Sequence, residues 1–162
     1  MKVIFLDVDG VLNNTKCKVK TPSGFPFVED ELIIRLKQII DATGAKVVLS
    51  STWRQGYYDL ERGVKGIAAT DYILLRDKLL SFGIEIFDHT PIIKSWRRGT
   101  EIALWLQETK YEIEAIVVLD DKYDVDPLGQ FLVRTSVTEG LRTKHVIKAI
   151  RMLNGQSIHN KN

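Results

Sequence analysis

The sequence has little of what marks secreted, membrane or zinc-thiolate proteins. Cys17 is the only cysteine among 162 residues, which excludes an internal disulfide and any zinc site built from several cysteines. No apolar run approaches the roughly 20 residues of a membrane-spanning helix. The start also lacks a basic segment followed by an apolar signal core. We therefore expect a cytoplasmic protein with no membrane partner.

An excess of charge of one sign is also missing. The 23 basic and 21 acidic residues leave a formal net charge of +2, which permits a polyanionic partner without requiring one. The hydrophobic share of 44% and the charged share of 27% are those of an ordinary globular protein. The length suits one domain with a full core, which we place at residues 1–153, with residues 154–162 as a flexible tail. Composition leaves the oligomeric state undetermined.

Apolar patterns alternate between strand-like and helix-like along the chain. Short apolar runs predict strands at 3–6, 46–50, 84–87, 115–119 and 131–133. Helical spacing predicts helices at 29–43, 70–82, 99–110 and 143–153. Residues 14–27 read as a loop with a short hairpin, and residues 55–70 give no clear element. This order predicts an α/β fold with a mainly parallel sheet between helical layers.

Two acids follow the first predicted strand immediately. Because alternate residues of an extended chain share a face, Asp7 and Asp9 can point into the same space. Like charges so close repel each other unless a cation lies between them, and oxygen ligands favour a hard ion such as Mg²⁺. The plainer alternative is a strand that ends in a polar Asp-Gly turn.

Other polar groups follow other predicted strands. Ser50 ends the second strand, and Asp120 and Asp121 end the fourth, while a basic cluster precedes a helix at residues 94–98. Ligands of such sheets bind beyond the carboxyl ends of the strands. A phosphoryl-transfer site needs a nucleophile, a proton shuttle, a metal, donors for phosphate oxygens and a fixed cation, and these stretches supply a candidate for each.

The stretch DVDGVLN resembles the first motif of the haloacid-dehalogenase-like (HAD) phosphotransferases. The resemblance implies that Asp7 is the nucleophile and Asp9 the general acid and base. VVLS is similar to the second motif, which assigns Ser50 to the phosphate. LDDKYD resembles the acidic pair that completes the Mg²⁺ site, so that the implied ligands are Asp7, Asp9, Asp120 and Asp121, with Asp121 the more direct of the last two.

The third motif of this superfamily is a single basic residue, for which Lys94, Arg97 and Arg98 compete. Lys94 and Arg98 are the favoured pair. Arg54 is a candidate for binding substrate phosphate, and its alternative is a surface arginine in an ion pair. Trp53 and Trp96 are candidate stacking platforms for bases, whereas Trp105 lies on an apolar helix face and is expected in the core.

Together, SSTWR, LDDKYD and RRGTEIALWL look like the HAD domain of RNA-repair proteins and the phosphatase half of polynucleotide kinase-phosphatases. This resemblance implies a three-layer α/β/α Rossmann-like HAD fold and a Mg²⁺-dependent phosphatase with an aspartyl-phosphate intermediate. No insert is long enough for a large cap domain, which favours a bulky phosphorylated substrate such as a nucleic-acid 3′-phosphate or a nucleotide. The alternative is a non-catalytic phosphate-binding module or a regulatory module phosphorylated on aspartate.

Overall fold

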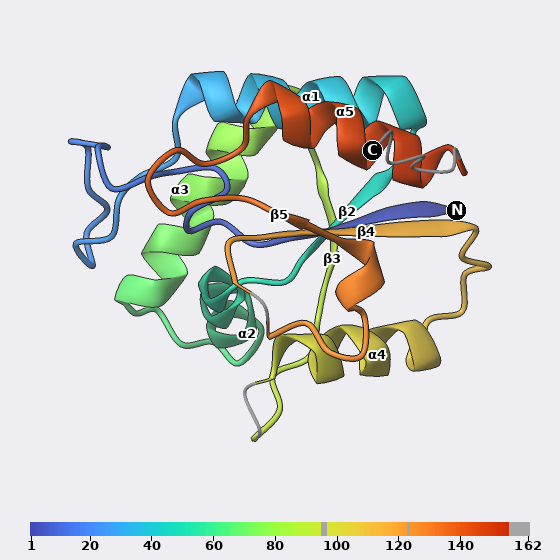
Figure 1. Cartoon of the computed structure of the whole chain (residues 1–162). Helices are drawn as coiled ribbons and strands as arrows, with labels where there is room; N and C mark the ends of the chain where they lie inside the picture. The colour runs from blue at the N-terminus through green and yellow to red at the C-terminus, as the bar shows by residue number, and fades with distance from the viewer. Residues whose placement is uncertain (95–96, 123, 156–162) are drawn as a thin grey trace.

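A computed structural model describes residues 1–94, 97–122 and 124–155 of the chain (Figure 1). Five parallel strands form one sheet in the order β3-β2-β1-β4-β5. The strands are β1 (Lys2–Leu6), β2 (Lys46–Leu49), β3 (Ile86–His89), β4 (Ala115–Asp120) and β5 (Leu132–Arg134). The prediction of a parallel α/β sheet is confirmed, with β1 at its centre.

The strands are apolar throughout because both faces of the sheet are covered. Successive strand residues point to opposite faces, so Ile4 and Leu6 enter one core while Val3 and Phe5 enter the other. Neighbouring strands follow the same alternation, since the parallel register places Val47 beside Ile4 and Val48 beside Phe5. Continuous apolar runs are what a sheet buried on two sides requires.

Helices form the two outer layers (Figure 1). The core that contains Ile4 and Leu6 also receives apolar residues of α1 (Asp30–Thr43), α3 (Ile67–Ser81) and α5 (Thr143–Leu153). The opposite core receives Ile102 and Trp105 of α4 (Arg98–Glu108). Trp105 is only 5% exposed and meets Phe5 edge-on at 5.4 Å between ring centroids, as expected for a core residue. The three-layer arrangement of the HAD fold is therefore confirmed.

The segment after β2 contains more structure than its sequence pattern predicts. A 3-10 turn, η1 (Thr52–Arg54), leads into the short helix α2 (Gln55–Glu61), and α3 begins at Ile67 rather than at residue 70. Gly56 looks like a helix breaker in the sequence, yet it is where α2 crosses α3. A Cβ atom there would lie 2.1 Å from the carbonyl oxygen of Ala68. The missing side chain permits this close crossing.

Strand β3 also begins later than predicted, at Ile86 instead of residue 84. The amide of Ile84 donates to the carbonyl oxygen of Leu79 at 3.0 Å, so this residue closes the turn that follows α3. Its side chain is only 2% exposed and packs in the core. Periodicity alone could not separate a buried helix terminus from the start of a strand.

The segment between β1 and α1 is a loop with one antiparallel bridge, between Lys20 and Pro26. This matches the predicted short hairpin, and the described chain contains no large cap domain. Of the predicted tail, residues 156–162 lie outside the described part of the chain. Within the described residues, no helix has the length and apolar content needed to cross a lipid bilayer.

Candidate active site

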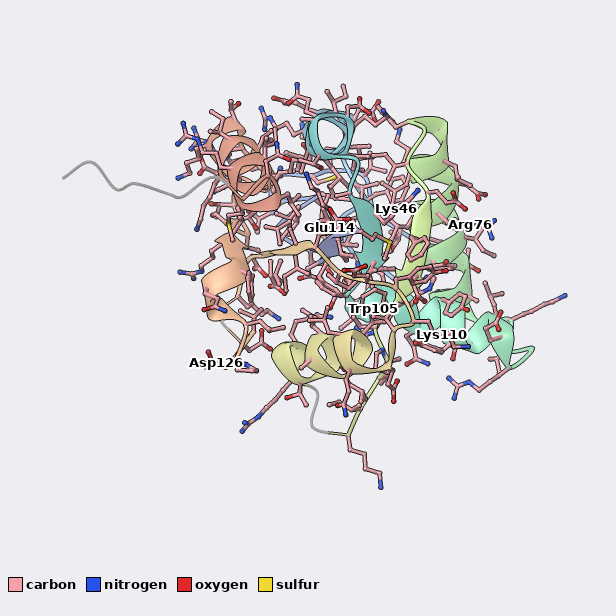
Figure 2. All side chains as sticks on the ribbon, turned by 90° about the vertical axis from the view of Figure 1, so that its right-hand side faces the viewer. Lys46, Arg76, Trp105, Lys110, Glu114 and Asp126 are labelled. Atoms are coloured by element: carbon pink, nitrogen blue, oxygen red, sulfur yellow. The ribbon has the colours of Figure 1, made fainter. Side chains whose placement is uncertain are left out.

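The parallel sheet brings the polar ends of three neighbouring strands together. The backbone amide of Asp7 donates to Leu119 of β4 at 2.9 Å, and the amide of Ser50 donates to Leu6 of β1 at 2.8 Å. Ser50, Asp7 and Asp120 therefore follow one another, in this order, across the carboxyl edge of the sheet. This edge of the sheet lies on the left in Figure 1. Figure 2 shows the opposite edge, where Lys46 and Glu114 lie at the amino ends of β2 and β4.

Three carboxylates form an acidic cluster at this edge: Asp7, Asp120 and Asp121. One oxygen of each lies within 4.8 Å of the others. Such a set fits a hard cation, because carboxylate oxygens are the ligands that Mg²⁺ prefers and because the cation would offset their mutual repulsion. The structure thus brings together three of the four acids that the sequence predicts as metal ligands.

Asp9 is the exception among the predicted metal ligands. Its carboxylate lies outside the acidic cluster, held by two donors, the side-chain amide of Asn13 at 2.8 Å and the indole N–H of Trp53 at 3.0 Å. The Asp9 side chain therefore faces Asn13 and Trp53 in this structure, and its assignment as a metal ligand stays a prediction. Sequence reasoning missed Asn13, a neutral residue whose amide gave no charge signal.

Among the basic candidates, Arg98 lies beside the acidic cluster. Its guanidinium nitrogens lie 3.8 Å from Asp7, 3.5 Å from Asp120 and 3.9 Å from Glu101. These distances are too long for hydrogen bonds, and Nε and Nη1 are buried without a hydrogen-bond partner among the described residues. Unpaired donors beside an acidic cluster suit the oxygens of a phosphate bound between them.

The other two basic candidates lie differently. Lys94 and Arg97 are exposed, and in the described part of the chain neither pairs with the acidic cluster. The structure therefore supports Arg98 and does not support Lys94 as the phosphate-binding cation. Helix α4 begins at Arg98, so its first residue is fixed by the helix while the two preceding candidates remain outside it.

Gly99 explains how Arg98 comes so close to the sheet edge. The amide of Gly99 donates to the carbonyl of Asp124 at 3.1 Å. A Cβ atom at position 99 would lie 2.0 Å from the carbonyl oxygen of Asp126. Only glycine lets the start of α4 pack against the segment that follows β4.

Replacing Gly99 by alanine is expected to cost about 1–3 kcal/mol of stability, because a backbone carbonyl must move to admit the methyl group. The displaced α4 should also carry Arg98 away from Asp7. Gly129→Ala is the matched control, since its Cβ would approach nothing closer than 3.6 Å. Urea unfolding measures the stability, and equal unfolding midpoints for the two variants would contradict this account of Gly99.

Two adjacent serines follow β2. Ser50 is 1% exposed, and its oxygen accepts a hydrogen bond from the Thr90 hydroxyl at 3.3 Å. The neighbouring Ser51 is fully buried, and its hydroxyl has no hydrogen-bond partner of normal geometry among the described residues. Burial raises the pKa of Asp7, and the nearby Ser51 hydroxyl offsets part of this rise by favouring the charged carboxylate. Sequence reasoning assigned a role only to Ser50, although Ser51 stands beside it.

Arg54 has a different position from the predicted one. Its side chain is 3% exposed and pairs with the equally buried Glu101 at 2.6 Å. Its Nε and Nη1 atoms donate to the carbonyl oxygens of Thr90 and Ser51, at 2.9 and 2.6 Å. The ion pair of the alternative is thus present, although it is buried instead of lying at the surface. These partners engage the guanidinium nitrogens that were predicted to bind substrate phosphate. Arg54 instead joins η1 to α4 and to the end of β3.

The surroundings of two of these acids disfavour their charged forms. Burial raises the pKa of Asp7, and the nearby Arg98 opposes this effect. Burial also raises the pKa of Asp120 to about 7, and the negative charge of Asp7 adds to the increase. Groups with shifted pKa values often lie in functional sites, because burial and neighbouring charges adjust the pKa values of catalytic groups.

The remaining aromatic and histidine candidates divide between core and site. Trp53 is 6% exposed and contacts Asp9, so it belongs to the site, while Trp96 lies outside the described residues. His89 is buried and stacked on Tyr57 with ring centroids 3.8 Å apart, and burial lowers its pKa to about 4. This histidine therefore stays neutral near pH 7 and serves packing.

A family model described as the HAD domain in Swiss Army Knife RNA repair proteins matches residues 3–146, from β1 to the first turn of α5. The matched range contains the acidic cluster, Asp9, Ser50 and Arg98. None of the curated proteins matches this chain.

Proposed function

The chain belongs to the family of HAD domains in Swiss Army Knife RNA repair proteins, and on this premise we propose that it is a Mg²⁺-dependent phosphatase with an aspartyl-phosphate intermediate. One observation carries the proposal: Asp7, Asp120 and Asp121 converge within 4.8 Å of one another, next to a cation with unpaired donors. Each part of this arrangement has a role in phosphoryl transfer.

In the first step, a carboxylate oxygen of Asp7 attacks phosphorus, and the bond from phosphorus to the alcohol oxygen breaks. Asp9 gives its proton to that leaving oxygen. In the second step, Asp9 takes a proton from water, which attacks the phosphorus and releases phosphate from Asp7. Asn13 and Trp53 hold the Asp9 carboxyl in place for both transfers.

The phosphate oxygens need partners during both steps. Arg98 offers its two unpaired nitrogens, and the hydroxyls of Ser50 and Ser51 lie at the same edge. Asp7, Asp120 and Asp121 would hold Mg²⁺, which neutralises charge on the transferring group when bound. Arg98 and the metal together would offset part of the negative charge that the acidic cluster and a dianionic phosphate bring to the site.

The proposed substrate is a bulky phosphorylated molecule such as a nucleic-acid 3′-phosphate or a nucleotide. The loop between β1 and α1 contains a single bridge, and the segment from η1 to β3 packs into the domain itself. Neither forms a folded cap that would enclose a small metabolite. An open sheet edge leaves room for a large substrate.

The direct test is phosphate release from an aryl phosphate with and without Mg²⁺. The proposal predicts release that requires the metal and stops with a chelator. A regulatory or non-catalytic phosphate-binding module, the alternative function, would bind the metal without releasing phosphate. Binding without turnover would therefore reject the phosphatase.

Mg²⁺ affinity is expected to rise with pH. A carboxyl must lose its proton to bind the metal, and the pKa of Asp120 is raised to about 7. Below that value the carboxyl is protonated and competes with Mg²⁺; above it the site is ionised. We expect affinity about tenfold lower at pH 6 than at pH 8 from this single group, with proton release on binding. Calorimetry in buffers of different ionisation enthalpy measures both quantities, and equal affinities would contradict the prediction.

A further inference from the structure

A small cavity adjoins the candidate active site on the side of Asp9. Its volume is about 210 Å³, and its lining comes from three segments of the chain. The hairpin of the first loop contributes Ser23 and Phe25, η1 contributes Thr52 and Trp53, and α3 contributes Ile67 and Asp71. We call this space the Trp53 cavity. It is smaller than the roughly 300–1,000 Å³ of a pocket for a whole drug-sized ligand, so it suits one ring system.

The hairpin wall of the Trp53 cavity is fixed to α3. The hydroxyl of Thr21 donates to Asp71 Oδ2 at 3.1 Å, and the Ser23 hydroxyl donates to the same oxygen. Asp71 is only 5% exposed, and its second oxygen, Oδ1, is buried without a partner among the described residues. The cavity therefore has a built wall and a carboxylate oxygen that still needs a donor.

The other walls are apolar and aromatic. Phe25 is 51% exposed and Ile67 is 56% exposed, although both border a cavity. The rings of Phe25 and Trp53 lie 6.4 Å apart between centroids and are tilted by 43°, so they form two sides of a wedge. The exposed ring of Phe25, at the mouth of the cavity, is suited to stacking on a flat ligand, with the buried Trp53 behind it.

The position of the Trp53 cavity relates it to one end of the substrate. The indole N–H of Trp53 donates to Asp9 at 3.0 Å, so the floor of the cavity is also the support of the proposed general acid. Asp9 protonates the leaving oxygen, and the leaving group must therefore lie on this side of the phosphate. A second cavity of about 240 Å³ lies on the other side of Thr52 and is lined by charged residues that include Arg54, Arg98 and Glu101.

We propose that the Trp53 cavity binds the nucleobase of the nucleotide from which the phosphate is removed. A base supplies a flat ring for Phe25 and Trp53 and N–H groups for Asp71 and for the hydroxyls of Ser23 and Thr52. A phosphotyrosine fits less well, because its ring is bonded directly to the phosphate oxygen and must stay close to the phosphate. Asp7 and Asp9 are not among the described residues that line the cavity, so the cavity suits a ring that lies farther from the phosphate. This inference rests on the proposed function and names its substrate class.

The test compares four phosphate donors with the full chain and Mg²⁺: acetyl phosphate, a ribose phosphate without a base, the matching nucleoside monophosphate and a phosphotyrosine peptide. The base is expected to raise kcat/KM about 10- to 100-fold over the ribose phosphate, in line with the contribution of one stacked base. Phe25→Ala should reduce this ratio about tenfold. Ile92→Ala is the control because Ile92 lines the charged cavity instead, and it should leave the ratio unchanged.

The outcomes distinguish base binding in the Trp53 cavity from the proposed phosphatase activity. Hydrolysis of acetyl phosphate without any preference for the base would overturn the inference and leave the phosphatase standing. If Ile92→Ala lowered the kcat/KM ratio of nucleotide to ribose phosphate and Phe25→Ala did not, the leaving group would lie in the charged cavity. A preference for a phosphotyrosine peptide would overturn the nucleotide as the substrate class. No hydrolysis of acetyl phosphate would remove both proposals. Since Phe25 is half exposed, its alanine variant should fold. Ile67→Ala is a second substitution in the lining of the same cavity.

Discussion

Asp7→Asn is expected to lower phosphatase turnover by on the order of 10³-fold or more, the scale seen when a catalytic nucleophile is removed. The amide keeps the shape of the carboxylate but cannot form the phosphoryl bond. The fold should persist, because burial raises the pKa of Asp7 and thus disfavours its charge in the metal-free protein. Phosphate release and thermal unfolding, measured on the same preparation, provide both readings.

Asp41→Asn serves as the control for this variant. Asp41 lies on α1, is largely exposed and pairs with Lys37 four residues earlier, so its loss removes one negative charge without touching the sheet edge. Turnover of the control should match that of the unaltered protein. If Asp7→Asn retained comparable turnover, a covalent intermediate on Asp7 would be excluded and the reaction would need another nucleophile.

Glu101→Ala is expected to destabilise the protein by about 3–5 kcal/mol, the cost of removing one partner of a buried ion pair. Glu101 and Arg54 are each 3% exposed and lie 2.6 Å apart. Burial already lowers the pKa of Arg54, and the carboxylate of Glu101 opposes this shift. Without Glu101 the guanidinium remains buried, charged and held by backbone carbonyls alone. The free energy of unfolding in urea measures the loss.

Glu139→Ala tests whether burial is the cause. Glu139 forms an ion pair with Arg142 in which the side chains are 44% and 50% exposed. Exposed pairs contribute only about 0–1 kcal/mol, because water screens both charges. Similar losses for Glu101→Ala and Glu139→Ala would show that the pair between Arg54 and Glu101 does not join η1 to α4 as the structure indicates.

The sequence predicted those features of the fold and the site that depend on residues adjacent in the chain. Val3 to Leu6 reads as a buried strand because a sheet covered on both faces needs an unbroken apolar run. Asp7 and Asp120 were recognisable because each follows such a run directly. By contrast, α2 was missed because Gly56 resembles a helix breaker. Gly56 is present because α2 crosses α3 closely at this residue, and a local sequence pattern contains no information about such a crossing.

The choice among the three basic candidates also depended on tertiary structure. Lys94, Arg97 and Arg98 are equivalent as cations in the sequence, and a helix that starts at Arg98 was predicted only to within a residue or two. Packing of Gly99 against Asp126 decides which of them reaches Asp7. The pairing of Arg54 was hidden for a related reason, since its partner Glu101 is distant in the chain and only the fold brings the two together.

The sequence by itself determined the parallel α/β architecture and the strand ends at which the acids lie, because strand burial and residue order are properties of short segments. Tertiary structure alone decided that Asp9 turns toward Trp53 and away from the acidic cluster, that Arg98 is the neighbouring cation, and that Phe25 and Asp71 border a cavity beside the site. The physical reason is that these relations join segments tens of residues apart, and side-chain direction at a turn follows from packing rather than from residue type.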